Sequence, residues 1–135
     1  MDKVTLQTHS IHLQGERSPT YQLVEDALKR KKLLTNASSA DWRIVIYNEN
    51  IQRKTASLTS EGLTAQYELK LSIDYQILDS QQKPLRPRNT LQIFRYYNFN
   101  QYDVAASDGE ASLLRMEIRS AASRQIVRQL QLLQR

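Results

Sequence analysis

The chain has 135 residues, of which 40% are hydrophobic, and a formal net charge of +5. This length suits one domain with a core of its own, so we expect a single domain over residues 1–135. The sequence contains no cysteine, which excludes disulfides, thiolate metal sites and cysteine nucleophiles. It also contains no run close to the roughly 18 apolar residues that span a membrane.

The positive charge is unevenly distributed. Residues 1–80 hold ten Lys+Arg and ten Asp+Glu, whereas residues 81–135 hold nine and four. The excess lies in the last third of the chain, where it indicates either an anionic partner or a solvated helix face.

The N-terminal part predicts a strand followed by a helix. Residues 4–13 form the strand candidate, and a polar loop follows at residues 14–18. Ser18 is expected to cap the helix, with Pro19 at its first position and apolar residues at helical spacing after it. The four cations of residues 29–32 fall in the last helical turn, where they complement the helix dipole. A nucleic-acid-binding patch is the alternative.

A long hairpin is predicted next. One strand begins at Trp42 and continues to about Leu58, and its far half is too polar for a core, so we expect it to project from the domain. Ser60-Glu61-Gly62 is the predicted turn, with Gly62 supplying a positive φ. Residues 67–78 then alternate strictly between apolar and polar, which is typical of a strand with one buried face. Twelve residues span about 40 Å, an unusual length for a strand.

A third long strand is predicted over residues 91–99, after a turn at residues 79–84. Phe94 and Tyr96 are apolar positions on the face opposite Ile93 and Tyr97. This pattern suggests that the second face of the sheet is partly covered, by another element or by a partner.

The last predicted element is a helix capped by Ser107 or Asp108, with Glu110 in its first turn. The predicted buried stripe consists of Leu114, Ile118, Ala121, Ala122, Gln125 and Leu132. Leu113, Val127 and Leu130 fall off this stripe, so the helix is either buried on two sides or presents a second surface. The element order β-α-β-β-β-α predicts an α+β two-layer sandwich, in which two helices cover one face of a four-stranded, mostly antiparallel sheet.

The sequence holds no recognisable catalytic constellation. Phosphate-binding glycine loops, nucleophile elbows and paired metal-binding histidines are all absent. We therefore expect a non-enzymatic protein with no cofactor and no metal. A double-stranded RNA-binding domain has a similar element order, but it needs basic residues where this last helix begins with Asp108 and Glu110. A free-standing basic module that binds nucleic acid is the alternative function.

Four pieces of the sequence occur in an order that is typical of one family. They are the alternating residues 67–79, then Lys83-Pro84-Leu85-x-Pro87, then Leu91-x-Ile93-x-Arg95-x-Tyr97, and then the arginine-rich helix of residues 113–130. Together they resemble the LptE (RlpB) family of lipopolysaccharide-assembly lipoproteins. The resemblance covers about residues 55–133, and the upstream part is compatible in pattern only.

The resemblance implies a non-enzymatic lipoprotein on the periplasmic side of the outer membrane of Gram-negative bacteria. Such a protein plugs the lumen of the β-barrel LptD, assists the assembly of that barrel and can bind lipopolysaccharide. It implies no nucleic-acid partner, and it implies membrane contact only through a lipid anchor. Family members begin with a signal peptide and a lipidated cysteine, so we expect this chain to be trimmed past that anchor.

The resemblance also points to candidate contact residues. Known members carry a basic residue in the turn between the second and third strands and another just before the last helix. The matching positions here are Ser60, beside Glu61 and Gly62, and Ser107. Neither is basic, so the expected lipopolysaccharide or partner contacts extend to the nearby cations Arg53, Lys54 and Arg95.

Overall fold

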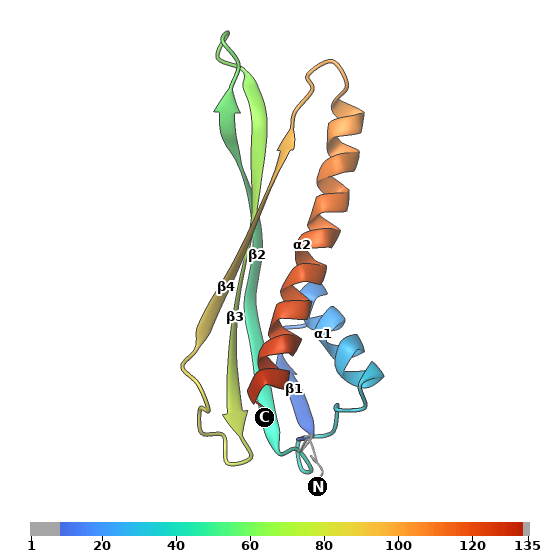
Figure 1. Ribbon diagram of the computed structural model, residues 1–135, viewed down its shortest axis with the longest axis vertical. Coiled ribbons are helices and arrows are strands. Elements are labelled where there is room, and N and C mark those ends of the chain that lie inside the picture. Colours follow the sequence, from blue (N-terminus) through green and yellow to red (C-terminus); the bar gives the residue numbers. More distant parts are fainter. Residues whose placement is uncertain (1–8, 134–135) are drawn as a thin grey trace, which may run out of the picture.

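The chain folds into one twisted sheet with two helices on one side (Figure 1). The computed structural model describes residues 9–133. Its elements are β1 (Ile11–Gly15), α1 (Pro19–Arg30), β2 (Trp42–Leu58), β3 (Thr64–Asp79), β4 (Asn89–Asn98) and α2 (Val104–Leu133). The strand order is β1-β2-β3-β4, with β1 parallel to β2 and the other pairs antiparallel. The predicted α+β two-layer sandwich is confirmed.

The core lies between the sheet and the two helices. Alternate residues of β3, from Leu69 to Ile77, are buried, as the strict alternation of the sequence predicts. Helix α1 contributes Val24 and Leu28, and α2 contributes a run that includes Ile118. Burying one such aliphatic side chain stabilises the fold by about 1.5–3 kcal/mol, more than an exposed ion pair contributes. The buried apolar face of β3 therefore contributes strongly to stability, together with the core residues of β2 and both helices.

The molecule is elongated, and its two ends differ (Figure 1). At one end the β2–β3 hairpin projects beside the start of α2, and we call this the hairpin end. At the other end lie β1, the C-terminal part of α1 and the β3–β4 connection. Ser18 caps α1 through a hydrogen bond from the Tyr21 amide, and Gly62 has a φ of +84° in the hairpin turn. Both local predictions are confirmed.

Strand β1 differs from its prediction. It begins at Ile11 and extends through Gly15, where a loop was expected, and residues 4–8 of the predicted strand lie outside the described part. The reason is the parallel pairing of β1 with β2, which continues to the Gly15–Ile46 pair. Gly15 has a φ of +126°, and a Cβ atom there would lie 2.0 Å from the Ile46 carbonyl oxygen. Only glycine fits this position.

An irregularity in β2 redirects one acidic side chain toward the helices. The register between β2 and β3 shifts between Tyr47 and Asn50, as in a β-bulge. Glu49 therefore faces the helices, where its Oε1 accepts a hydrogen bond from the Thr20 amide of α1 (2.9 Å). Its Oε2 lies 3.1 Å from Nε of Arg119 on α2. One carboxylate, 5% exposed, thus joins the sheet to both helices.

Near the bulge, side-chain hydrogen bonds also join the strands on the face of the sheet away from the helices. We call this face the open face. Asp74 of β3 accepts hydrogen bonds from Thr90 of β4 and Asn48 of β2. These donors, Thr90 first and Asn48 second, lower the pKa of Asp74 below its ordinary value. The carboxylate consequently connects three neighbouring strands through side chains alone.

Helix α2 begins earlier than the sequence indicated. It starts at Val104, and the carboxylate of Asp103 accepts a hydrogen bond from the Ala106 amide (3.1 Å). The predicted caps Ser107 and Asp108 are wrong, since both lie inside the helix, and Glu110 is not in its first turn. Asp103 thus has the capping role that was expected of Ser107 or Asp108, and it satisfies one of the free amides of the first turn.

The predicted stripe of α2 is correct only in its first half. Ile118, Ala121 and Ala122 are buried, but Gln125 and Leu132 are exposed. Val127 and Leu130, which fall off the predicted stripe, are buried instead. The helix packs against α1 as well as the sheet, so the alternative of burial on two sides holds for its C-terminal half.

The second face of β4 is not covered by another element of the described residues. Phe94 and Tyr96 are 42% and 55% exposed on the open face. Of the two explanations for these apolar positions, cover by another element is therefore wrong for residues 9–133. Cover by a partner stays a prediction.

Candidate functional site

The register places the predicted basic residues on two faces of the sheet. Arg53 of β2 pairs with Leu69 of β3, which pairs in turn with Arg95 of β4, so the three form one row on the helix side. Lys54 pairs with Glu68 in the next row. Because successive side chains of a strand alternate, Arg53 and Lys54 face opposite sides of the sheet despite being neighbours in sequence.

Arg53 belongs to an aromatic cluster on the helix side of the hairpin end. Its guanidinium carbon lies 4.2 Å from the centroid of the Tyr67 ring, a cation–π geometry. The Tyr67 ring contacts Tyr97 and Phe99, with centroid distances of 5.5 and 5.3 Å. Nη1 of Arg53 donates a long hydrogen bond to the Tyr97 hydroxyl (3.5 Å). We call these four residues the Arg53 cluster.

The Arg53 cluster combines a permanent positive charge with an aromatic floor. The hydrogen bond to Tyr97 raises the pKa of Arg53 above its ordinary value, so the guanidinium stays charged. Arg53 is exposed, and its planar fork suits a phosphate or a carboxylate. Nothing in the spacing of the sequence predicted this arrangement, although the alternation of β2 and β3 put Arg53 and Tyr67 on one face.

Arg95 is tied to α2. Its Nε lies 2.7 Å from Oε1 of Glu117, and its Nη1 donates to the Phe94 carbonyl oxygen (2.8 Å). Both groups are partly exposed. The side chain thus links the end strand of the sheet to the helix, a structural role that the sequence did not indicate.

On the open face, Lys54 takes part in a small polar cluster. Its Nζ lies 3.6 Å from Oε1 of Glu68, and the Tyr96 hydroxyl donates to Oε2 of Glu68 (3.0 Å). The nearby carboxylate raises the pKa of Tyr96. Glu68 is only 8% exposed, so Lys54 and Tyr96 cover it from solvent.

The hairpin turn itself carries no cation. The Ser60 hydroxyl donates to the Glu61 carboxylate (3.0 Å), and the Gly62 amide donates to the Thr59 carbonyl oxygen (3.0 Å). The exposed apolar residues at this end are Leu58 and Leu63 on the hairpin, Tyr102 before α2 and Val104 at its first position. The hairpin end therefore exposes small, apolar and acidic groups.

Ser107, the other predicted contact, is buried in the structure at 4% exposure. Its Oγ accepts a hydrogen bond from the Asn100 amide (2.9 Å). The hydroxyl holds the β4–α2 connection in place, so it is not available at the surface.

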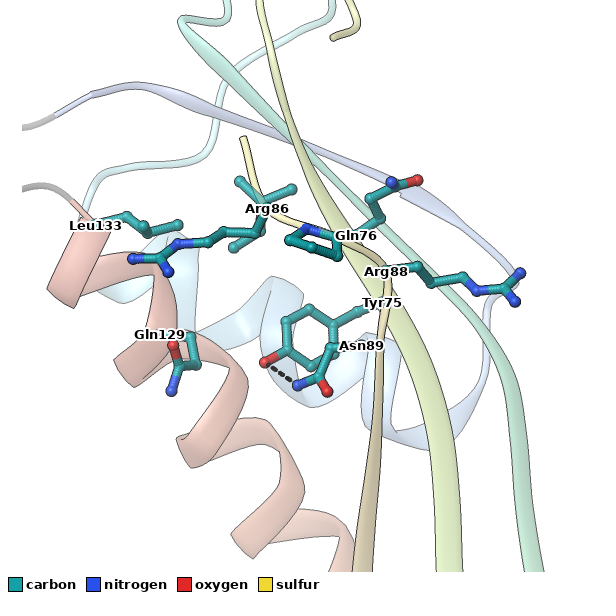
Figure 2. A pocket seen from close by; sticks show the side chains of 9 residues that line it. Tyr75, Gln76, Arg86, Arg88, Asn89, Gln129 and Leu133 are labelled. Atoms are coloured by element: carbon teal, nitrogen blue, oxygen red, sulfur yellow. Dashed lines mark hydrogen bonds between the residues drawn. The ribbon is translucent and has the colours of Figure 1, made fainter. Parts of the chain in front are cut away.

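A cavity of about 290 Å³ lies at the other end of the molecule, between the β3–β4 connection and the last turns of α2 (Figure 2). Its polar groups include Tyr75, whose hydroxyl accepts a hydrogen bond from Nδ2 of Asn89 (3.0 Å), and Gln129. The side chain of Arg86 extends toward α2, whereas Arg88 points to the other side (Figure 2). No pattern in the sequence predicts this cavity, because it forms only where the ends of β3 and α2 meet.

Residues 9–133 hold no cluster of three or more His, Cys, Asp or Glu side chains suited to a metal ion. His9 stacks on Trp42 with a centroid distance of 4.3 Å, and Nδ1 of His12 lies 3.3 Å from the Thr35 carbonyl oxygen. Over the same residues, no helix combines the length and the apolar character that a membrane crossing requires.

The two-layer fold is shared with bacterial lipoproteins of known structure. Rare lipoprotein B from Shewanella oneidensis matches with a TM-score of 0.77 at 21% identity, covering 90% of this chain and 92% of that one. Lipoprotein B from Nitrosomonas europaea matches with a TM-score of 0.76 at 18% identity, covering 97% and 90%. At these identities the similarity shows the fold.

Sequence comparison shows the family. The model of the LptE family, described as lipopolysaccharide-assembly, matches residues 6–130. The LPS-assembly lipoprotein LptE of Yersinia enterocolitica is 31% identical over 126 residues, which cover 85% of this chain and 58% of that protein. The protein of the same name from Pectobacterium atrosepticum is 27% identical over 130 residues, covering 93% and 68%. The chain belongs to the LptE family, as the resemblance in the sequence predicted.

Proposed function

We propose that this chain acts in lipopolysaccharide assembly as the folded domain of an outer-membrane lipoprotein, anchored on the periplasmic side and without catalysis. The observation that carries the proposal is its membership of the lipopolysaccharide-assembly family over residues 6–130. The names of its relatives support the same role. This membership favours the proposal over the nucleic-acid alternative.

Within that role, we infer that the domain plugs the lumen of the LptD β-barrel and assists its assembly. A plug has to reach across the membrane thickness and present polar groups, because barrel interiors are polar. Strand β3 has 16 residues and spans about 50 Å, against about 30 Å for the hydrocarbon core. Its open face carries charged and amide side chains between Gln66 and Gln76. Both properties support the inference.

Co-purification tests the plug. When the chain is expressed as the secreted, lipidated form together with LptD, we expect a tag on this chain to retain the barrel through detergent extraction and washing. A tagged lipoprotein of unrelated fold is the control for capture by detergent micelles. Retention of no more barrel than the control retains would overturn the plug, while leaving a role elsewhere in lipopolysaccharide assembly.

The Arg53 cluster is the part of the predicted site best suited to lipopolysaccharide, whose lipid A carries phosphates. Arg53 can bind a phosphate with two parallel hydrogen bonds while its face rests on Tyr67. The turn residues Ser60, Glu61 and Gly62 are further contacts in this proposal, at the tip, whereas Lys54 is paired with Glu68 on the open face and is assigned no contact. We assign no lipopolysaccharide contact to the buried Ser107, and Arg95 acts through its link to α2.

Arg53→Gln is expected to weaken lipopolysaccharide binding roughly tenfold or more, since it removes charge-assisted hydrogen bonds. Lys54→Gln is the matched control, because it removes one charge at the neighbouring position on the opposite face. Binding of labelled lipopolysaccharide to the two purified variants measures the difference. A larger loss in Lys54→Gln would move the site to the open face, and unchanged binding in Arg53→Gln would exclude the cluster.

A further inference from the structure

The end of the molecule opposite the hairpin brings together segments that are far apart in sequence. Ile11 pairs with Trp42 of β2 and forms a bridge to Leu34, which follows α1. Trp42 in turn pairs with Asp79, the last residue of β3. The end of α1 and the β3–β4 connection therefore lie at the same end of the sheet (Figure 1).

This end is strongly basic. We call it the basic end and define it by seven exposed cations: Lys29, Arg30, Lys31, Lys32, Lys83, Arg86 and Arg88. Nearby carboxylates have local partners. Asp79 accepts from the Gln81 and Lys83 amides of its own turn. Asp41 binds the Ser10 amide. The helix dipole explains Lys29 and Arg30 in the last turn of α1, but not the cations of the β3–β4 connection.

The cavity of Figure 2 lies within the basic end, which therefore has a concave site as well as positive charge. Arg86 extends beside Leu133 and Gln129 of α2 in that view. The remaining walls include the apolar residues Ile77 and Pro87. A cation next to apolar walls suits the junction between a phosphate headgroup and a hydrocarbon chain, where charge and apolar surface adjoin.

The position at which the described chain begins favours a membrane as the partner of the basic end. The first described residue, His9, lies at this same end, where its ring stacks on Trp42. The function proposed above is that of an anchored lipoprotein. A lipid attached on the N-terminal side would hold the basic end against the bilayer. Nucleic acid fits less well, because single strands are bound by stacking on aromatic side chains. The most exposed aromatic residues, Tyr96 and Tyr102, lie on the open face and at the hairpin end.

We propose that the basic end is a docking surface for the anionic phospholipid headgroups of a bilayer, and that it orients the domain with its hairpin directed away from that surface. Basic residues close to an anionic membrane each strengthen binding, and a polybasic patch is a common second signal beside a lipid anchor. This proposal rests on the lipoprotein role but not on the barrel or on the Arg53 cluster.

Vesicle binding by this chain, without an anchor, tests the proposal. We expect the chain to sediment with vesicles of phosphatidylcholine mixed with phosphatidylglycerol, to stay in solution with phosphatidylcholine alone, and to be released by high salt. The triple variant Lys31→Gln, Lys83→Gln, Arg86→Gln should bind the anionic vesicles on the order of 100-fold more weakly, since each cation contributes about a fivefold factor.

The matched control is the triple variant Lys70→Gln, Arg115→Gln, Arg124→Gln, which removes the same charge away from the basic end. We expect its vesicle binding to fall far less. Equal losses of vesicle binding in both variants would show that only net charge matters. That result would overturn the proposal of a defined docking surface. Binding to neutral vesicles, no vesicle binding, or tighter binding of an RNA oligonucleotide through the same three residues would also overturn the proposal. Circular dichroism checks that both triple variants fold. Co-purification with the barrel is measured separately, because the proposal does not rest on the barrel.

Discussion

Gly15→Ala is expected to destabilise the fold by about 3 kcal/mol or more. The new Cβ atom would lie 2.0 Å from the Ile46 carbonyl oxygen, and the φ of +126° is unfavourable for any side chain. Relief would require β1 to separate from β2, which would also break the hydrogen bond from the Glu16 amide to Ile46.

Gly109→Ala is the matched control for this change. Gly109 lies inside α2, and a Cβ atom there meets no atom within 4 Å. Alanine should therefore stabilise the helix by about 0.5–1 kcal/mol. Urea unfolding followed by circular dichroism measures both variants. Equal stability of Gly15→Ala and the wild-type chain would contradict the parallel pairing of β1 with β2.

Glu49→Ala is expected to destabilise the fold by about 3 kcal/mol, because it leaves a partly buried Arg119 without its carboxylate and the Thr20 amide without its acceptor. Glu49→Gln keeps an acceptor for the Thr20 amide and should cost less. The comparison of the two substitutions separates the charge from the hydrogen bond.

Glu117→Ala provides the matched control, since it breaks another carboxylate–arginine pair of α2 at a more exposed position. The Glu117 side chain is 52% exposed, against 5% for Glu49, so its loss should cost less than about 1 kcal/mol. Unfolding in urea at neutral pH measures all three variants. A similar small loss for Glu49→Ala would show that the connection between sheet and helices does not depend on this carboxylate.

The contrast between these two carboxylates shows what the sequence could and could not predict. The strict alternation of β3 predicted its buried face, and the turn residues predicted the hairpin, because both depend on local backbone geometry. The role of Glu49 depends on a register shift in β2, and no local pattern marks that shift. In α2 the buried stripe was predicted only where the helix faces a single neighbour. Its C-terminal half also packs on α1, which a single helical period does not describe.

The candidate site was likewise predictable only where it depends on local pattern. The sequence grouped Arg53 and Lys54 as neighbouring cations, and the register shift in β2 decides which of them faces the helices. The stacking of Arg53 on Tyr67 and the capture of Arg95 by Glu117 depend on pairing between strands and on the position of α2. Ser107 is buried because α2 starts at Val104, three or four residues before the expected cap at Ser107 or Asp108. The basic end unites residues 29–32 with residues 83–88, which only the fold places together.

The hydrogen bond from Arg95 to the Phe94 carbonyl oxygen has a bearing on how the chain avoids self-association. β4 is the last strand in the sheet order, and the unpaired backbone groups of an edge strand are a template for aggregation. A guanidinium that occupies one of these acceptors, and is itself held by Glu117, obstructs strand addition by a second copy. The aromatic-rich edge of the sheet is thus partly protected against pairing with a second copy of the chain.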